Sequence, residues 1–490
     1  MAMNFLPEMS EIRKIAAEGK YRVLPVSCEI LSDICTPIEA LEILKNVSAH
    51  CYLLESAKQD ETWGRYTFLG FDPRLEITCR DGEMKAGSIR FHTENPSDYI
   101  RQVLADYRSP RFPYLPPFTG GLVGYFSYDY LGYSEPAVRT GAEDTERFRD
   151  LDLMLFDKVI AFDNFRQKII LIANMQLDEG ETAYNRAVME LKQLAGLLKT
   201  GKKKREPGGH LLGEVKPLFE KQEFCRMVEA AKSHIREGDI FQIVLSNRLE
   251  APFEGSLFNT YRILRTMNPS PYMFYFSGTD VEVAGASPET LVKLEDGVLH
   301  TFPLAGTRPR GVTPEEDEML EAELLSDEKE LAEHNMLVDL GRNDLGKVSE
   351  FGSVQVEKLH SVERFSHVMH IGSTVRGKLR EGCDALDALE AVLPAGTLSG
   401  APKIRACQLI GELENNKRGI YGGAIGYIDF AGNMDTCIAI RIAYKKGGKV
   451  FVRSGAGIVA DSVPEKEYEE CINKAKAVVN AMKRAKEADL

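Results

Sequence analysis

The chain has 490 residues, of which 43% are hydrophobic and 28% are charged. This balance is typical of a soluble globular protein and excludes disordered, fibrous and disulfide-stapled chains. The length corresponds to about three domains, or to one large α/β domain with a smaller partner. The 74 acidic residues exceed the 61 basic ones, and the formal net charge is -13. A negative surface works against binding to nucleic acids or anionic membranes, so the expected partners are small molecules and proteins.

The sequence carries no membrane or export signal. No stretch approaches the ~18 consecutive apolar residues of a membrane helix, and residues 1–20 hold no apolar signal segment. Nine cysteines are scattered from Cys28 to Cys471 without a Cys-x-x-Cys pair, which predicts reduced thiols and argues against disulfides or a zinc site. We therefore expect a cytoplasmic protein.

In chain order, the first distinctive element is a glycine turn that enters a strand, Gly120–Phe126, and the same pattern returns at Gly422–Ile428. Such short pairs also arise by chance, so a duplication of sheet elements remains one of two interpretations. A composition break with basic residues, proline and glycine spans Leu197–Pro217. It predicts a linker or surface loop between an amino-terminal region, 1–196, and a carboxy-terminal region, 218–490. Its basic tetrad, Lys202–Arg205, is interpreted as solvated in so acidic a chain.

Beyond the linker, helices and strands are mixed. Apolar residues at helical spacing predict a helix that ends at Gly238, and a buried strand follows at Ile240–Leu245. The further predicted elements are strands at Tyr272–Phe276 and Cys437–Tyr444 and helical stretches at Pro314–Leu340 and Cys383–Val392. No regular alternation of strand and helix connects them. This order favours an α+β fold over a doubly wound parallel sheet.

Two pairs of glutamates indicate a metal site. Glu330 and Glu333 share one helix face, as do Glu467 and Glu470 after Pro464 opens the final helix. Like charges one turn apart need either full solvation or a cation. If the fold brings both pairs together, an all-oxygen site for Mg²⁺ follows. Nucleotide cofactors are not expected, because the sequence holds neither a phosphate-binding G-x-x-x-x-G-K-[ST] loop nor a G-x-G-x-x-G turn between a strand and a helix.

The strand predicted at Cys437–Tyr444 carries an arginine among small residues. Strict alternation places Arg441 on the same face as Cys437 and two alanines, where a ligand has room. Its guanidinium can bind a ligand carboxylate or form a structural salt bridge. Downstream, Ser454–Gly457 follows a strand and is predicted to be a turn whose backbone N–H groups can meet an anion.

The remaining motifs form a recognisable set. In chain order they are Pro303–Arg308, Glu330–His334, Val338–Leu345, Gly396–Lys403, Gly419–Gly423, Gly455–Gly457 and Asp461–Pro464. Over about residues 220–480, these motifs resemble those of the chorismate-utilising enzymes. The segments Leu53–Ser56 and Gly120–Asp129 resemble the first region of anthranilate synthase component I. The resemblance implies large mixed or antiparallel β-sheets between helix layers.

Two positions distinguish the branches of this family. Isochorismate synthases place a lysine base for water in the strand that corresponds to Ile240–Leu245, where this chain has Gln242, which cannot take a proton. Aminodeoxychorismate synthases often carry a lysine nucleophile just before the Gly-Thr pair, where this chain has Ala305. The resemblance therefore implies that ammonia attacks ring C2 of chorismate as the C4 hydroxyl departs. Loss of pyruvate then gives anthranilate, the first step of tryptophan biosynthesis.

The resemblance also assigns roles to individual residues. Glu333 and Glu470 would hold Mg²⁺, Glu289 would be the general acid for the departing hydroxyl, and His370 would assist pyruvate elimination. Thr397 is the expected positioning residue. The residues expected to bind chorismate are Gly306, Thr307, Tyr421, Arg441, Gly455, Ala456 and Gly457, with Arg441 at the enolpyruvyl side chain.

Regulation and a partner are implied in the same way. Enzymes of this type bind L-tryptophan as a feedback inhibitor at segments matched here by Ser56, Pro271, Tyr272 and Met273. The sequence shows no glycine-flanked cysteine elbow of a glutaminase, so ammonia would come from a glutamine amidotransferase subunit, component II, in a heteromeric complex such as a heterotetramer. The alternatives are component I of aminodeoxychorismate synthase, an isochorismate-type enzyme and a non-catalytic tryptophan-sensing subunit.

Overall fold

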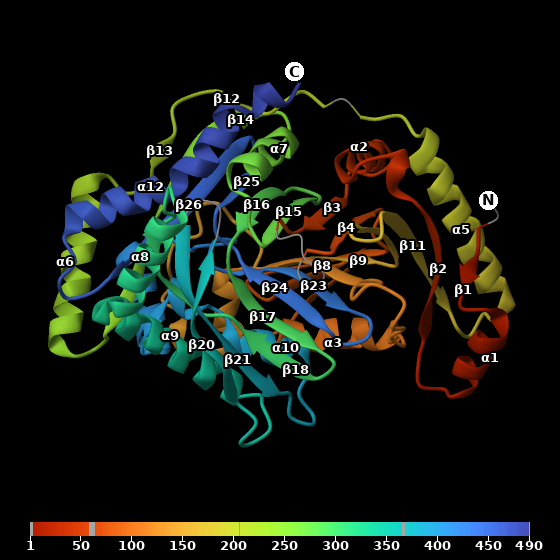
Figure 1. The fold of residues 1–490 in the computed structure, drawn as a ribbon, viewed down its shortest axis with the longest axis horizontal. Coiled ribbons are helices and arrows are strands. Elements are labelled where there is room, and N and C mark those ends of the chain that lie inside the picture. Colours follow the sequence, from red (N-terminus) through yellow and green to blue (C-terminus); the bar gives the residue numbers. More distant parts are fainter. Residues whose placement is uncertain (1–2, 58–63, 205, 365–367, 490) are drawn as a thin grey trace.

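The computed structural model of the chain describes residues 3–57, 64–204, 206–364 and 368–489. Two large β-sheets are stacked face to face, and helices cover the outer face of each (Figure 1). Neighbouring strands are antiparallel, and the space between the sheets holds most of the hydrophobic core. The predicted α+β class, with large antiparallel sheets between helix layers, is confirmed.

The first sheet contains strands from both ends of the chain. Its order is β1 (Phe5–Leu6), β2 (Val23–Leu31), β11 (Lys168–Gln176), β10 (Lys158–Asp163), β4 (Tyr66–Phe71), β3 (Cys51–Glu55), β15 (Tyr272–Ser277), β16 (Glu282–Ser287), β25 (Ile442–Lys446), β26 (Lys449–Ile458), β14 (Gln242–Glu254) and β12 (His210–Leu211). The short strands β13 (Lys216–Pro217) and β22 (Gly400–Ala401) also pair with β14.

The second sheet likewise joins the two regions. Its order is β19 (Leu304–Pro309), β21 (Val368–Lys378), β18 (Val298–Thr301), β17 (Thr290–Glu295), β24 (Met434–Ile438), β23 (Ala424–Asp429), β8 (Gly121–Phe126), β9 (Leu151–Phe156), β5 (Leu75–Arg80), β6 (Glu83–Ala86) and β7 (Ile89–His92), with β20 (Gln355–Arg364) paired to β21. Because β3 pairs with β15 and β8 with β23, both sheets continue across the regions 1–196 and 218–490.

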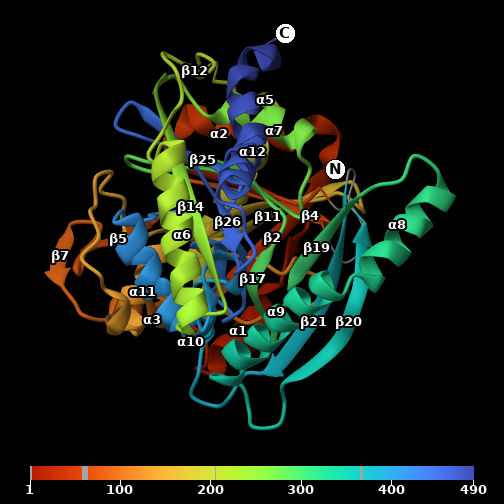
Figure 2. The ribbon, with the colours of Figure 1, turned by 90° about the vertical axis from the view of Figure 1, so that its left-hand side faces the viewer.

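Helices form the two outer layers, as the side view confirms (Figure 2). The first sheet is covered by α2 (Pro37–Val47), α5 (Glu181–Thr200), α6 (Lys221–Glu237), α7 (Phe258–Met267) and α12 (Pro464–Lys483), with α11 (Lys403–Glu414) against β14 and α1 (Met9–Ala17) at the β1 edge. The second sheet is covered by α3 (Pro96–Asp106), α8 (Pro314–Ser326), α9 (Glu328–Gly346) and α10 (Ala385–Val392); α4 (Leu131–Ser134) is a single turn. No helix in the described part of the chain has the length and apolar character that a membrane crossing requires.

One predicted helix end is confirmed here and two predicted boundaries are corrected. The helix ending at Gly238 is α6, whose left-handed cap has φ 86°. The stretch Pro314–Leu340 is wrong as one helix: Asp327 interrupts it and accepts two backbone N–H bonds at the start of α9. The linker begins after Thr200 and not at Leu197, because α5 continues to that residue. Lys203 of the linker pairs with Glu39 of α2 at 2.5 Å.

The two similar glycine-containing segments, Gly120–Phe126 and Gly422–Ile428, pair with each other in the structure. Strands β8 and β23 lie side by side, with Gly124 directly opposite Gly426. A Cβ at either glycine would lie 2.0 Å from a carbonyl oxygen of the next strand, Asp152 or Asp435, so neither position accepts a side chain. The order of strands around this pair is the same in both halves: β2-β11-β10-β4-β3 matches β14-β26-β25-β16-β15, and β8-β9-β5-β6-β7 matches β23-β24-β17-β18-β21. This is the arrangement expected of a duplicated unit.

Candidate active site and regulatory pocket

Glu289 lies in the short connection between β16 and β17. The Thr397 hydroxyl, in the 3₁₀ turn Gly396–Leu398, donates to its carboxylate at 2.9 Å. Burial raises the pKa of Glu289, although the Thr397 hydrogen bond and the charges of Arg441 and Lys474 oppose the shift. A raised pKa lets a carboxyl keep the proton that a general acid must deliver. A 40 Å³ cavity lined by Glu289 and Thr397 is large enough for a water-sized molecule.

Arg441 lies in an interruption of the predicted strand. The prediction of one strand over Cys437–Tyr444 is wrong, because β24 ends at Ile438 and β25 begins at Ile442. Strict alternation therefore fails at Arg441, whose φ of 52° is left-handed. Burial lowers the pKa of the guanidinium, and Glu289 opposes this shift. Within the described residues no acidic side chain forms an ion pair with Arg441, which leaves the guanidinium available for a ligand carboxylate.

His370 faces the Gly-Thr pair across neighbouring strands. Thr307 of β19 is opposite His370 of β21, and Nδ1 lies 3.0 Å from both the Thr307 hydroxyl and the Gly306 carbonyl oxygen. Since a carbonyl oxygen only accepts, Nδ1 carries the proton and Nε2 has a lone pair in the neutral ring. Burial lowers the pKa of His370, the Gly306 bond raises it and Arg441 lowers it further. His370 is thus suited to act as a base.

The segment Gly455–Gly457 is part of a strand. The prediction of a turn there is wrong, because β26 continues through it and pairs with β14, placing Gly457 opposite Val244. A Cβ at Gly455 would lie 2.9 Å from the Tyr421 hydroxyl, and one at Gly457 would lie 2.9 Å from the Gln242 amide nitrogen. The two glycines therefore let these polar groups approach the strand. Ala456 is fully buried in the core on the opposite face.

The glutamate pairs lie on α9 and α12 as predicted. Burial and the neighbouring Glu333 raise the pKa of Glu330; burial and the neighbouring Glu470 likewise raise that of Glu467, where a Ser462 hydrogen bond opposes them. Lys329 of α9 acts electrostatically on Glu467 of α12, so the two helix starts are neighbours. Within the described residues no three of these carboxylates have oxygens within 4.8 Å of one another. The all-oxygen donors and their mutual repulsion fit a divalent cation such as Mg²⁺.

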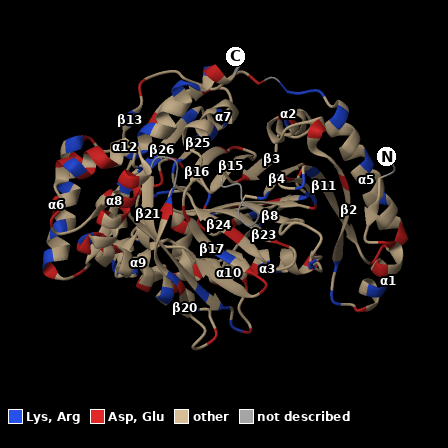
Figure 3. Ribbon diagram, viewed as in Figure 1, with Lys and Arg blue, Asp and Glu red and all other residues tan. Residues whose placement is uncertain are grey.

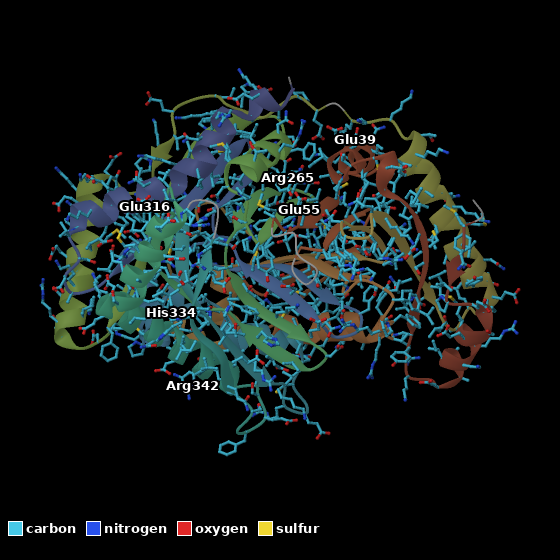
Figure 4. All side chains as sticks on the ribbon, viewed as in Figure 1. Glu39, Glu55, Arg265, Glu316, His334 and Arg342 are labelled. Atoms are coloured by element: carbon cyan, nitrogen blue, oxygen red, sulfur yellow. The ribbon has the colours of Figure 1, made fainter. Side chains whose placement is uncertain are left out.

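Helix α9 is fixed by the residue beside Glu333. His334, labelled in Figure 4, is fully buried and its Nε2 lies 2.7 Å from the Ser373 hydroxyl of β21. This contact turns one face of α9 towards the second sheet and leaves Glu330 and Glu333 on a less buried face. In the sequence, Glu330, Glu333 and His334 belong to one motif, which does not reveal that His334 packs in the interior while the two glutamates do not.

Lys474 was not predicted from the sequence. Its ammonium group pairs with Glu470 at 2.8 Å, donates to the Gly455 carbonyl at 3.2 Å and acts on Glu289. The spacing of four residues from Glu470 on one helix was the available signal. A second missed feature is the buried cluster of Glu414 with Arg418 at 2.5 Å and Arg453 at 2.7 Å. The Arg418 guanidinium lies 5.9 Å from the centre of the Tyr421 ring and helps to fix it.

A separate cavity of about 300 Å³ lies between the two sheets. All four residues predicted to bind the inhibitor line it, namely Ser56, Pro271, Tyr272 and Met273. Strands β3, β4 and β15 of the first sheet and β17, β23 and β24 of the second supply its walls. We call this cavity the intersheet pocket. The Tyr272 hydroxyl lies 2.9 Å from that of Thr290, the residue after Glu289, so the pocket and the Glu289 site are adjacent.

Charged residues of both signs cover the outer helices, and a basic stretch marks the linker (Figure 3). In the linker, Lys203 pairs with Glu39, and Lys204 pairs with Glu206 at 3.0 Å. The first contact attaches the linker to α2, and the second lies within the linker.

Comparisons with known proteins agree with this geometry. The family model described as chorismate binding enzyme matches residues 49–480. The chain is 45% identical to anthranilate synthase component 1 of Acetivibrio thermocellus and 46% identical to that of Aquifex aeolicus, each over 99% of both chains. It also superposes on the crystal structure of anthranilate synthase component I from Streptococcus pneumoniae with a TM-score of 0.77 and 39% identity, over 92% of this chain and 98% of that one. The chain therefore belongs to the chorismate binding enzymes and, within them, to the family of anthranilate synthase component 1.

Proposed function

We propose that this chain converts chorismate and ammonia to anthranilate and pyruvate in an Mg²⁺-dependent reaction. The observation that carries the proposal is the grouping of three residues: a buried acid, Glu289; Arg441, which forms no ion pair with the acidic side chains that the structure describes; and His370, whose pKa is lowered by burial. The names of the relatives denote the same activity. Gln242, beside Gly457, supports amination over hydration, because an amide cannot activate water.

In the first step ammonia forms a bond to ring C2 as the C4–O bond breaks. Glu289 donates its proton to the departing hydroxyl, which leaves as water. Arg441 binds a carboxylate of the substrate, with Tyr421, Gly306 and Thr307 around it. Glu333 and Glu470, with Glu330 and Glu467 alongside, would hold Mg²⁺, and the bound ion would supply positive charge to the ring carboxylate.

In the second step the aminated ring loses pyruvate. The Gly306 carbonyl holds the proton of His370 on Nδ1, so Nε2 is the atom that accepts the C2 proton as the bond to the enolpyruvyl oxygen breaks. A His370→Ala variant is expected to accumulate the aminated intermediate and to release pyruvate more slowly. Pyruvate release at the wild-type rate would remove this role.

Ammonia is proposed to come from a separate glutamine amidotransferase subunit. The designation component 1 of the relatives supports the existence of a second component. Purified chain with chorismate, Mg²⁺ and concentrated ammonium at alkaline pH should yield fluorescent anthranilate, whereas glutamine should be used only after the partner is added. Accumulation of 4-amino-4-deoxychorismate in place of anthranilate would favour the folate branch, and absence of turnover would favour a sensing subunit.

L-Tryptophan is proposed to inhibit by binding in the intersheet pocket. Its volume of about 300 Å³ and its lining by Ser56, Pro271, Tyr272 and Met273 support this assignment. Tryptophan should suppress anthranilate formation in the same assay. Unchanged activity and unchanged chorismate affinity at millimolar tryptophan would contradict it.

A further inference from the structure

A buried cluster next to Tyr421 contains one carboxylate and two guanidinium groups. Glu414 pairs with Arg418 at 2.5 Å and with Arg453 at 2.7 Å, and the three side chains are at most 1% exposed. Moving charged groups out of water is costly, so a buried ion pair is weak evidence of a stabilising role. The further hydrogen bonds of each arginine show what else the cluster holds in place.

Arg418 uses four of its five N–H donors. Nε and Nη2 donate to the two Glu414 carboxylate oxygens at 3.0 and 2.5 Å. Nη1 donates to the Leu398 carbonyl oxygen at 2.7 Å, and Nη2 also donates to the Val244 carbonyl oxygen at 2.7 Å. A guanidinium is planar and its donors point in fixed directions. Arg418 therefore fixes the distance between the backbone at Leu398 and the backbone at Val244.

The backbone at Leu398 belongs to the turn that holds the proposed acid. Leu398 directly follows Thr397, whose hydroxyl donates to the Glu289 carboxylate at 2.9 Å. Strand β14 is bonded to the same segment, since the Val244 N–H donates to the Ser399 carbonyl oxygen at 2.8 Å. The guanidinium thus adds a second connection between β14 and the turn, and this connection lies one residue from Thr397.

Aromatic rings connect Arg418 to a proposed substrate residue. The guanidinium carbon lies 4.6 Å from the centre of the Tyr128 ring and 5.9 Å from the centre of the Tyr421 ring. The packing here is close, because a Cβ at Gly422 would lie 3.2 Å from the Tyr128 ring. A cation over an aromatic face is attracted to it, so the guanidinium restrains both rings.

We propose that Arg418 is a positioning residue for the reaction. Its bond to the Leu398 carbonyl keeps Thr397 on Glu289, and its contact with Tyr421 keeps that ring at the substrate. The inference rests on the proposed function and adds a residue that acts only through these neighbours. Without the guanidinium the turn moves away from Glu289 and the Tyr421 ring gains freedom.

Arg453 offers a comparison within the same cluster. It binds the same carboxylate, and it donates to the Ser246 hydroxyl and to the Asn416 side-chain oxygen, each at 2.8 Å. Neither Ser246 nor Asn416 is a proposed site residue. The two arginines therefore share their burial and their anionic partner, but only Arg418 binds the turn next to Thr397.

The test compares Arg418→Lys with Arg453→Lys in the full chain, with chorismate, Mg²⁺ and ammonium. Both variants keep the charge but lose the guanidinium fork, and both should lower the melting temperature. We expect Arg418→Lys to lower kcat about ten-fold and to raise the KM for chorismate about five-fold, with the KM for ammonia changed less than about two-fold. Arg453→Lys should keep all three constants within about two-fold of wild type.

The rise in KM separates positioning from loss of folded protein, because a smaller active fraction lowers the apparent kcat and leaves KM unchanged. A wild-type KM for chorismate in Arg418→Lys, or equal kinetic changes in the two variants, would overturn the proposal. Absence of anthranilate formation by the wild-type protein would instead count against the proposed function.

The route through the turn is tested with Thr397→Val, which removes the hydroxyl that donates to Glu289. If Arg418 acts through this hydroxyl, adding Arg418→Lys to Thr397→Val should lower kcat by less than about two-fold more. A further loss of about ten-fold would show that the two residues act independently and would overturn the route.

A second variant, Tyr128→Leu, keeps every charge of the cluster and serves if Arg418→Lys does not fold. It removes the ring that lies nearer to the guanidinium and so loosens Arg418. We expect changes in the same directions as for Arg418→Lys, of about three-fold in kcat and in the KM for chorismate. Wild-type constants in Tyr128→Leu would overturn the proposal.

Discussion

The two halves of the molecule share one strand order but only the second holds the proposed catalytic groups. At matching strand junctions each half places one acid and one base. In the first half Arg74 precedes β5, Asp157 precedes β10, and the two form an ion pair at 2.5 Å. In the second half Glu289 precedes β17 and Arg441 precedes β25, with the charges exchanged and no ion pair between them within the described residues. An open charge pair can bind a ligand, and a closed one only supports the fold.

The second difference is an insertion. The first half joins β6 to β7 through a short turn, whereas the second half inserts β19, α8, α9 and β20 between β18 and β21. This insertion carries Gly306, Thr307 and the glutamates of α9, and its strand β19 holds His370 in place. The duplicated framework thus provides rigid strand ends, and the added elements provide the proposed metal ligands of α9 and the strand that contacts His370.

Substitution of Arg441 is expected to have the largest effect. Arg441→Ala should lower kcat/KM with ammonia about 1,000-fold, because the substrate carboxylate loses a buried charge-assisted partner. Arg74→Ala, its counterpart, should leave kcat/KM within about two-fold and lower only the melting temperature. Equal losses of activity in both variants would show that the open pair has no special role.

Substitution of Glu289 is expected to have the second largest effect on activity. Glu289→Gln keeps the shape of the side chain and an amide oxygen that can accept the Thr397 hydrogen bond, but it cannot deliver a proton. We therefore expect kcat to fall about 100-fold with KM little changed. Steady-state anthranilate formation at saturating chorismate measures this. Full turnover by Glu289→Gln would remove the role of general acid.

The proposed metal ligands on the insertion and on α12 have the third largest expected effect. Glu470→Gln should raise the Mg²⁺ concentration for half-maximal rate about ten-fold, because one anionic oxygen is lost. Glu469→Gln is the control, since that carboxylate pairs with Lys221 at 3.2 Å on another face of α12. Titration of chelated enzyme with Mg²⁺ distinguishes them, and an identical Mg²⁺ requirement in both variants would exclude Glu470 as a ligand.

The sequence carried enough information for the fold class, the helix ends and the motif residues. Gly238 marked the end of α6 because its lack of a Cβ suits a left-handed cap, and Pro464 marked the start of α12. These signals are local. The joining of both regions within two sheets is not local, because the pairing of Gly124 with Gly426 depends on residues about 300 apart in the chain.

The errors at the site have the same cause. Alternation places side chains only within an uninterrupted strand, and nothing in Cys437–Tyr444 reveals the left-handed turn at Arg441. Glycines in Gly455–Gly457 indicated a turn, yet they lie in a strand where tertiary neighbours, Tyr421 and Gln242, need the space. Lys474 was missed because an i, i+4 ion pair also occurs on ordinary surface helices.

The smallest expected effect is a pH dependence of stability. It distinguishes Glu289, which forms no ion pair within the described residues, from Glu295, which pairs with Arg111. The folded-state pKa of Glu289 is raised above its ordinary value of 4.5, mainly by burial. At a pH above 4.5 the Glu289 carboxyl is ionised in the unfolded chain but keeps its proton in the folded chain. The wild-type protein therefore loses stability as the pH rises, until the pH passes the folded-state pKa. The melting temperature of Glu289→Gln relative to wild type should therefore increase from about pH 5 to about pH 8, by about 2 °C.

Glu295 provides the opposite sign in the same sheet. Burial alone would raise its pKa, but hydrogen bonds and charges from Arg111 and Lys293 lower it overall. Its ionised form is thus favoured in the folded state, and Glu295→Gln should be less stable than wild type above the unfolded pKa, with the gap closing as pH falls. Thermal unfolding of the three proteins across this range checks both signs. Parallel curves for Glu289→Gln and wild type would mean that the Glu289 carboxyl is as easily ionised as a solvated one.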